Sequence, residues 1–244
     1  MAAASVLRRL VHVVLPVDCG TCALPLSDDP IPFFCRGCWE DIAPMAGPAC
    51  PRCGRPFASR IALAYSETHR CSDCRRRVPA YSRAWSGYVY DGTIRDALRL
   101  FKYEKKVALA HPLGRLLAKA ASVQPFETDV IVPVPLYSAR LRERGFNQSL
   151  LLADRLARAT GIPVSALSLT RIRATPSQTD LTRRARLQNL RRAFSVRRPA
   201  EIAGRRVLLI DDVFTTGTTV NECAKALRKA GAADVQVVTL ARTV

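Results

Sequence analysis

Two adjacent carboxylates, Asp211 and Asp212, directly follow the apolar residues Val207–Ile210. A short apolar run of this kind is typical of a parallel strand that is buried on both faces. Carboxylates at the end of such a strand can hold sugar hydroxyls, and their oxygens suit Mg²⁺ that accompanies substrate phosphates. The pair is therefore the candidate catalytic centre, and we expect it just past the end of the strand.

A hydroxyl-rich turn follows the acidic pair and leads into a helix. The helix is predicted by apolar residues that share one face and by a glycine placed to end it: Val220, Cys223, Ala224, Leu227 and Gly231. Backbone N–H groups at a helix start favour a phosphate, and a glycine lets the backbone approach it. An ordinary polar connection is the alternative, but it requires neither two acids nor four threonines. The candidate ligand-binding residues here are Val213, Thr215, Thr216, Gly217, Thr218 and Thr219.

Eight of the nine cysteines form four Cys-x-x-Cys pairs within the first 74 residues. The two sulfurs of such a pair converge on one point, and two pairs complete the tetrahedral sulfur shell that zinc prefers. A shell closed by four thiolates has no open position for substrate, which indicates a structural role. A cross-brace pairing is the alternative to pairing in sequence order. Sequence order predicts one site from Cys19, Cys22, Cys35 and Cys38 and a second from Cys50, Cys53, Cys71 and Cys74.

Other uses of paired cysteines fit this pattern less well. A redox-active Cys-x-x-Cys normally occurs once, at a helix start in a thioredoxin-like unit. Disulfides are rare in the cytoplasm, where we expect this protein, and the spacing gives an iron–sulfur cluster no particular support. The ninth cysteine, Cys223, falls on the apolar helix face and is interpreted as a small core residue.

Composition bounds the class of protein. The 244 residues suffice for one good-sized domain and a small one, and the net charge of +18 favours contact with phosphates of nucleotides, nucleic acid or membranes. No stretch approaches the roughly twenty apolar residues of a membrane span. Charged residues interrupt the apolar run Val6–Pro16, so we expect no signal peptide and a cytoplasmic location.

Between the cysteines and the acidic pair, predicted strands and helices alternate, as in a parallel α/β domain. The pattern predicts strands at Ala84–Tyr90, Asp129–Pro135 and Asp234–Ala241, and helices around Ile94–Phe101, Val107–Ala121 and Leu150–Ala157. We expect the basic stretch Leu136–Arg144 to be a loop that binds an anion at the carboxyl edge of the sheet, with Arg140, Arg142 or Arg144 as its cations. A solvated basic loop is the alternative.

The segment Arg171–Arg206 is the most basic part of the chain, with eleven arginines against Asp180 and Glu201. A long polar segment inside a compact domain is usually functional or disordered. Its charge fits a lid that closes over a phosphorylated ligand, and it fits an arm that binds nucleic acid equally well.

The order of these parts resembles the ComF/GntX family over nearly the whole chain. Val207–Val220 is similar to the phosphoribosyl-pyrophosphate motif of type I phosphoribosyltransferases, and the region around Gln178 resembles the flexible loop of amidophosphoribosyltransferases. Arg144-Gly145-Phe146-Asn147-Gln148-Ser149 is the most family-specific of the shared segments. The others are Tyr90-Asp91-Gly92, Phe101-Lys102-Tyr103, Val132-Pro133-Val134-Pro135 and Thr175–Asn189.

The resemblance implies a type I phosphoribosyltransferase-like α/β fold, a parallel sheet with flanking helices in residues 81–244, preceded by a double zinc ribbon in residues 1–80. It assigns the loop after Val132 to pyrophosphate, the turn Thr215–Thr219 to the 5′-phosphate, and the acidic pair to the ribose hydroxyls. Zinc at two structural sites, and Mg²⁺ with phosphoribosyl pyrophosphate, are the implied cofactors. The further ligand-binding residues are Pro133, Val134, Pro135, Arg144, Asn147, Gln148, Gln178 and Arg186.

Two hypotheses for function follow. In the first, the protein is a phosphoribosyltransferase that displaces pyrophosphate from the ribose, linked to DNA uptake and competence as some family members are. In the second, it is a non-catalytic accessory protein that binds a phosphoribosyl ligand, single-stranded DNA or DNA-uptake proteins. The acidic pair favours a working ligand site, and the excess of arginine favours a contact with a polyanion. The two hypotheses are compatible.

Overall fold

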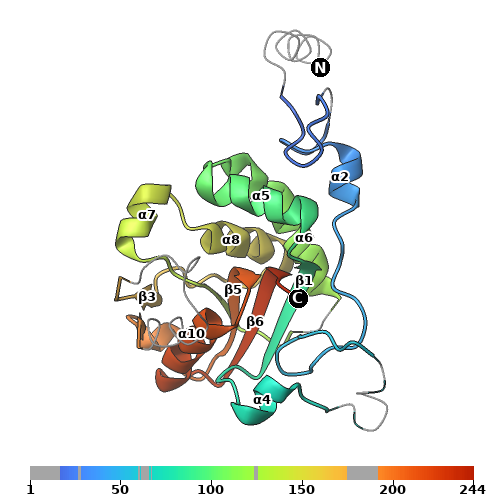
Figure 1. The fold of residues 1–244 in the computed structure, drawn as a ribbon. Helices are drawn as coiled ribbons and strands as arrows, with labels where there is room; N and C mark the ends of the chain where they lie inside the picture. The colour runs from blue at the N-terminus through green and yellow to red at the C-terminus, as the bar shows by residue number, and fades with distance from the viewer. Residues whose placement is uncertain are drawn as a thin grey trace.

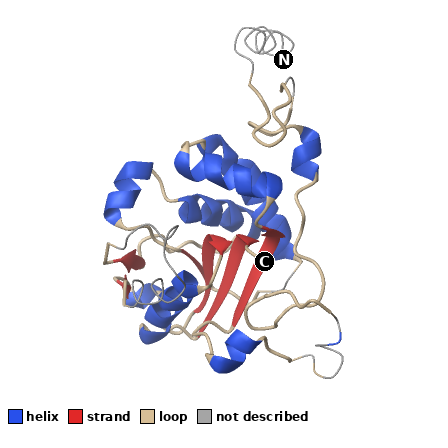
Figure 2. Ribbon diagram, viewed as in Figure 1, coloured by secondary structure: helices blue, strands red, loops and turns tan. Residues whose placement is uncertain are grey.

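A four-stranded parallel sheet forms the centre of the computed structural model (Figures 1 and 2), which describes residues 17–26, 29–59, 61, 66, 68–123, 126–174 and 192–244. The strands are β1 (Arg83–Val89), β2 (Val130–Pro133), β5 (Arg206–Phe214) and β6 (Asp234–Arg242), in the order β1-β6-β5-β2. The expected parallel α/β fold is confirmed. Strand β5 is central because its apolar start is flanked on both sides by other buried strands.

Helices cover both faces of the sheet, so alternate residues of β5 enter two different cores. Leu208 and Ile210 pack with α5 (Gly92–Tyr103), α6 (Ala110–Ser122) and α8 (Gln148–Thr160). Val207 and Leu209 pack with α10 (Thr218–Lys229) on the opposite face. Burial on both faces explains why the first part of β5, Val207–Ile210, is an unbroken apolar run. A short 3-10 helix, η1 (Val107–Leu109), precedes α6.

Two expectations about the site region are corrected. The acidic pair lies within β5, because Asp211 still pairs with Thr239 of β6 and the strand continues to Phe214. The expected basic loop contains a helix, α7 (Ser138–Arg144), whose side chains are mostly exposed. A short charged helix of this kind has no apolar stripe by which a sequence pattern could reveal it.

The start of the most basic segment pairs with residues 194–196 of the same segment in a small antiparallel sheet. Its strands are β3 (Leu169–Arg171) and β4 (Phe194–Val196), and the 3-10 helix η3 (Pro199–Glu201) follows. Gln178 and Arg186, which we expected to bind ligand, lie outside the described residues.

The cysteine pairs and the helices α2 (Arg36–Glu40) and α4 (Ser72–Arg76) precede the sheet. The first cysteine set, Cys19, Cys22, Cys35 and Cys38, lies beside α5 (Figure 1). Thr21 in this part of the chain donates a hydrogen bond of 3.3 Å to Asp96 of α5. The second set shares a core with α10 and the sheet. Between them, the backbone at Pro44 pairs with Tyr88 and so covers the outer edge of β1. None of the helices in the described ranges is long and apolar enough to cross a membrane.

Candidate functional site

The acidic pair on β5 is held by contacts from α5 and α8. The Ser149 hydroxyl, at the start of α8, donates to Asp211 Oδ1 at 3.0 Å, and the Asp212 N–H donates to the same oxygen at 3.0 Å. Lys102 Nζ, near the end of α5, forms an ion pair with Asp212 Oδ2. The side chains of Lys102 and Asp212 are only 16% and 7% exposed. The two carboxylates therefore lie in a largely buried site that contains its own cation.

Burial and charge set the protonation of this site. Burial raises the pKa of Asp211 to about 6, while the positive charge of Lys102 and the Ser149 hydrogen bond oppose that rise. Burial also lowers the pKa of Lys102 to about 8, against the attraction of Asp211. At neutral pH Asp211 is thus a carboxylate that can accept hydrogen bonds from sugar hydroxyls. The carboxylate oxygens of the pair also suit Mg²⁺, although direct ligation by Asp212 Oδ2 requires Lys102 to move away.

The segment Arg144–Ser149 supports the acidic pair through the Ser149 hydroxyl. Gly145 takes a left-handed φ of 85° as α7 ends, and the Asn147 side chain accepts from the Ser149 N–H at 3.0 Å to begin α8. The Asn147 amide also donates to Val134 O at 3.1 Å, which ties α8 to the chain after β2. Arg144 is buried and donates to Gln148 Oε1 at 2.6 Å. The structure therefore engages Arg144, Asn147 and Gln148, which we expected to contact ligand, in hydrogen bonds within the protein, and Asn147 is the one of the three that bonds to Ser149.

A cavity of about 290 Å³ opens between the end of α5, at Lys102, and α7. Four cationic side chains line it against one acid, which makes it suitable for a polyanion such as pyrophosphate. It adjoins the acidic pair through the Lys102–Asp212 ion pair. Sequence reasoning assigned no role to Lys102 or Lys105, although Lys102 lies in a segment shared with the ComF/GntX family. The lining residues are Lys102, Tyr103, Lys105, Arg140, Glu143 and Arg144.

The threonine loop, Thr215–Thr219, connects β5 to α10. Gly217 has a φ of 74°, in the left-handed region, and a Cβ at this position would lie 2.5 Å from Phe214 Cζ. Glycine is thus required both by the turn and by the aromatic ring beneath it. The hydroxyls of Thr216 and Thr218 lie 2.9 Å apart at the start of α10. Hydroxyl donors and unpaired N–H groups at a helix N-terminus suit a phosphate group.

A second cavity, of about 260 Å³, lies between the threonine loop and the second cysteine set. From the loop side it is lined by Phe214 and residues 215–218, and from β6 by Arg242. The loop expected to bind phosphate is thus in contact with the zinc-ribbon part of the chain. The ribbon-side residues are Cys53, Arg55, Cys71, Asp73, Cys74 and Arg77.

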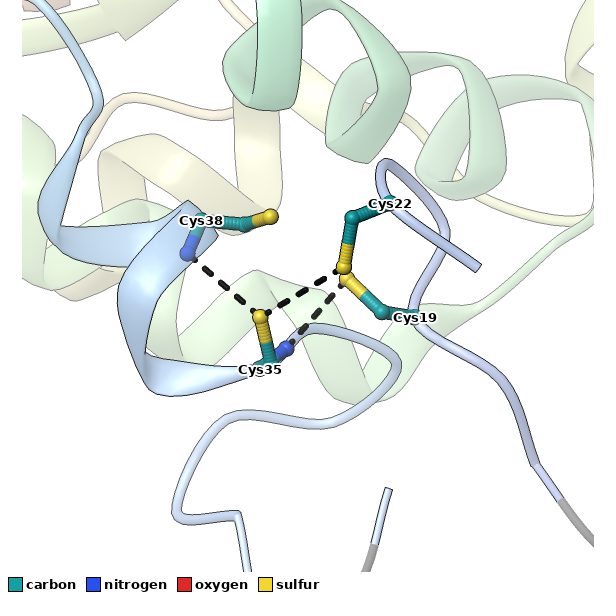
Figure 3. Close-up of side chains that lie close together, drawn as sticks. All are labelled: Cys19, Cys22, Cys35 and Cys38. Carbon is teal, nitrogen blue, oxygen red and sulfur yellow. Dashed lines mark hydrogen bonds between the residues drawn. The ribbon is translucent and has the colours of Figure 1, made fainter. Parts of the chain in front are cut away.

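The eight paired cysteines form two groups, in sequence order and not as a cross-brace. Within each group the sulfur atoms lie within 4.8 Å of one another. Cys22 and Cys35 Sγ are 3.8 Å apart, and Cys53 and Cys71 Sγ are 3.6 Å apart. A tetrahedral zinc site with Zn–S bonds of about 2.3 Å requires sulfurs about 3.8 Å apart, so both groups fit zinc. In the first group the four sulfurs face a common centre (Figure 3).

Comparison with known proteins agrees with this geometry. A double zinc ribbon domain model matches residues 10–75, and a phosphoribosyl transferase domain model matches residues 147–243. Fold and sites together define the class: two zinc ribbons joined to a parallel-sheet phosphoribosyltransferase-type domain. The DNA utilization protein YhgH of Salmonella typhimurium is 34% identical over 95% of this chain and 99% of its own length. The chain belongs to the ComF/GntX family.

Two further relatives are named competence proteins. Competence protein F of Haemophilus influenzae is 35% identical over 86% of this chain and 90% of its own length. Competence protein ComFC of Bacillus subtilis is 30% identical over 86% of this chain and 84% of its own length. Among solved structures, the glutamine phosphoribosylpyrophosphate amidotransferase of B. subtilis shows 29% identity with a TM-score of 0.37, covering 53% of this chain and 25% of that one.

Proposed function

We propose that the protein binds phosphoribosyl pyrophosphate with Mg²⁺ and transfers the phosphoribosyl group to an acceptor, in a process linked to DNA uptake. One observation carries the proposal: β5 presents the acidic pair and then continues directly into the threonine loop. A ribose held by Asp211 and Asp212 would thus have its 5′-phosphate near the start of α10. We also propose the division into a double zinc ribbon, residues 1–80, and a phosphoribosyltransferase-like domain, residues 81–244.

In the proposed reaction, an acceptor nucleophile forms a bond to C1 of the ribose as the bond from C1 to the pyrophosphate oxygen breaks. Pyrophosphate leaves with the electron pair of that bond. Asp211 and Asp212 hold the ribose hydroxyls and lie near the positive charge that develops on the ring. Lys102, Arg140 and Arg144 offset the negative charge of the leaving group in the cationic cavity. Bound Mg²⁺ would add further neutralisation of the pyrophosphate.

The second candidate is a non-catalytic accessory protein that binds DNA, and the net charge of +18 favours it. It differs from the first in what the acidic pair is for. A DNA-binding surface gains nothing from Asp211 and Asp212, whereas a phosphoribosyl site depends on them. Substitution of Asp211 and Asp212 therefore distinguishes the two candidate functions.

Phosphoribosyl pyrophosphate with Mg²⁺ is expected to raise the thermal midpoint of the parent protein by roughly 5–10 °C at a hundredfold excess over Kd. Asp211→Asn combined with Asp212→Asn should abolish the rise, because the amides remove the negative charge that orients the sugar and metal. Differential scanning fluorimetry measures both. Asp154→Asn, an exposed carboxylate paired with Arg158, is the matched control and should retain the shift. A parent protein whose midpoint does not move favours the DNA-binding candidate.

The affinity for ribose 5-phosphate should rise with pH around pH 6. The pKa of Asp211 is raised by burial to about 6, so below this pH the group is a neutral acid and loses acceptor capacity. The phosphate of the ligand titrates in the same range. Calorimetric titrations between pH 5 and 7, below the pKa of about 8 of Lys102, should therefore be repeated with Asp211→Asn, whose profile lacks the titration of this carboxylate. Identical profiles for the parent and Asp211→Asn would exclude a role for this carboxylate.

A further inference from the structure

Arg242, at the end of β6, lies between the second cysteine set and the threonine loop. Its side chain is buried, with 4% of the residue exposed. Its Nη1 donates a hydrogen bond of 2.6 Å to the backbone carbonyl of Cys53, inside the Cys50–Cys53 pair. Its Nε has no hydrogen-bond partner among the described residues. A buried guanidinium with so few polar partners calls for another source of stabilisation.

The aromatic ring of Phe214 supplies part of that stabilisation. The guanidinium carbon of Arg242 lies 4.4 Å from the centre of this ring, close enough for a cation–π contact. Tyr81 packs edge-on against the same ring at 6.4 Å. The ring in turn lies under Gly217, where a Cβ would be only 2.5 Å from Phe214 Cζ. Contacts therefore run without a break from Cys53 through Arg242 and Phe214 to the backbone of the threonine loop.

A second connection runs through Asn221, in the first turn of α10. Its side-chain oxygen accepts from the Ala80 N–H at 2.8 Å, and Ala80 follows the Cys71–Cys74 pair in the chain. Its own N–H donates to Gly217 O at 3.0 Å. The loop is thus tied to the segment after the second cysteine set as well as to the set itself.

Charge explains why Arg242 can be buried here. The metal-bound form of the second set carries net negative charge, because four thiolates outnumber the charges of the ion. Arg55, a second cation of the adjoining cavity, is paired with an acid, since its Nη1 lies 3.0 Å from Asp73 Oδ2. Arg242 is buried and already contacts the Cys53 carbonyl and the Phe214 ring, so it is suited to a structural contact and not to direct binding of a ligand.

We propose that Arg242 is a positioning residue that couples the second zinc site to the phosphate loop and so sets the affinity for the phosphomonoester end of the ligand. This inference rests on the proposed function for the identity of the ligand. It assigns the second ribbon a role in ligand binding, in addition to a role in stability. It also predicts that the two ends of the ligand respond differently to a change at Arg242.

Arg242→Gln is expected to weaken binding of ribose 5-phosphate at least about tenfold, a change equivalent to about 1.4 kcal/mol. Binding of inorganic pyrophosphate, which we place in the cavity beside Lys102, should stay within about twofold of the parent. Arg242→Lys should recover part of the affinity for ribose 5-phosphate, because it keeps a cation and a donor. Isothermal titration calorimetry measures both ligands. Arg228→Gln is the matched control. Arg228 lies in the last turn of α10, far along the helix from the threonine loop, and donates to the Ala232 backbone oxygen.

Hydrogen exchange of the free protein gives a readout that needs no ligand. Arg242→Gln should accelerate amide exchange at residues 215–220 while the centres of β5 and β6 keep parental protection, and Arg228→Gln should not. Unchanged exchange in the loop would overturn the coupling, and so would equal losses of affinity for both ligands. If the parent binds neither ligand, the proposed function fails, whereas the exchange result still decides whether Arg242 positions the loop.

Discussion

Cys74→Ser is expected to destabilise the whole sheet, whereas Cys22→Ser disturbs the first ribbon alone. Cys74 is 3% exposed and its group packs in one core with Val207, Leu209 and Val220. Cys22 is exposed, and in its group only Cys19 is buried, whereas all four cysteines of the second group are buried. Equal chemical changes should therefore have unequal consequences.

The size of the effect follows from the energy of a structural zinc site. Zinc binding contributes about 10–16 kcal/mol in small zinc domains, which is comparable with the roughly 5–15 kcal/mol of stability of a typical domain. Loss of a substantial part of this energy from a site inside the main core should bring the chain close to global unfolding. A site whose cysteines are mostly accessible to solvent can lose its metal with local unfolding only.

Zinc content and hydrogen exchange distinguish these outcomes. Each variant should lose about one zinc ion, measured by mass spectrometry of the metal. Amides in β5 and β6 should lose protection in Cys74→Ser and retain it in Cys22→Ser. Equal protection of the sheet in both variants would show that the second site contributes no more to the main core than the first does.

Lys102→Met is expected to cost about 3–5 kcal/mol of stability, because it leaves the carboxylate of Asp212 buried without its cation. The double variant Lys102→Met with Asp212→Asn should recover part of that loss, since Asp211 is then the one carboxylate of the pair left without the charge of Lys102. Urea denaturation of the two single variants and the double variant yields the coupling energy. A loss below about 1 kcal/mol for Lys102→Met would indicate an ordinary solvent-exposed pair.

Lys105→Met is the matched control for this experiment. Lys105 lines the same cationic cavity but is exposed, and it forms no ion pair with any of the described residues. We expect a change in stability below about 0.5 kcal/mol, as for other exposed substitutions. Both lysine variants should weaken binding of inorganic pyrophosphate, because each removes one cation from the cavity. The control thus separates the contribution to folding from the contribution to ligand binding.

Sequence patterns predicted the fold because its main elements carry strong local signals. The apolar run before Asp211 is typical of a strand covered on both faces, and Ile94, Leu98 and Phe101 share the face of α5 that is buried. The cysteine spacing likewise predicted two sulfur clusters, whereas the choice between pairing in sequence order and a cross-brace came from the structure. The expectation that the acidic pair lies past the end of the strand was wrong by a few residues, because the backbone pairing of β5 with β6 continues where the side chains become polar.

The contacts that complete the site could not be predicted in this way. Lys102 meets Asp212 because α5 crosses near β5, and no local pattern contains that distance. Arg242 ends a strand and has no motif around it, so its contact with Cys53 is visible only in three dimensions. Asn147 and Gln148 belong to the most family-specific segment, yet Asn147 accepts from the Ser149 N–H and Gln148 accepts from Arg144. Family resemblance located these residues without indicating what they contact.

The hydrogen bond from Arg242 to Cys53 joins residues 189 positions apart, and Ser82 bonds to Asp234 across 152 positions. Contacts of such long range form late, because the entropy of closing a large loop must first be overcome. During synthesis the second ribbon can therefore collect its four sulfurs early, but it docks only after β6 has emerged from the ribosome. A cut at residue 80 would separate the double zinc ribbon from the phosphoribosyltransferase-like domain. It would not separate two folding units, because the second ribbon and the sheet share one core.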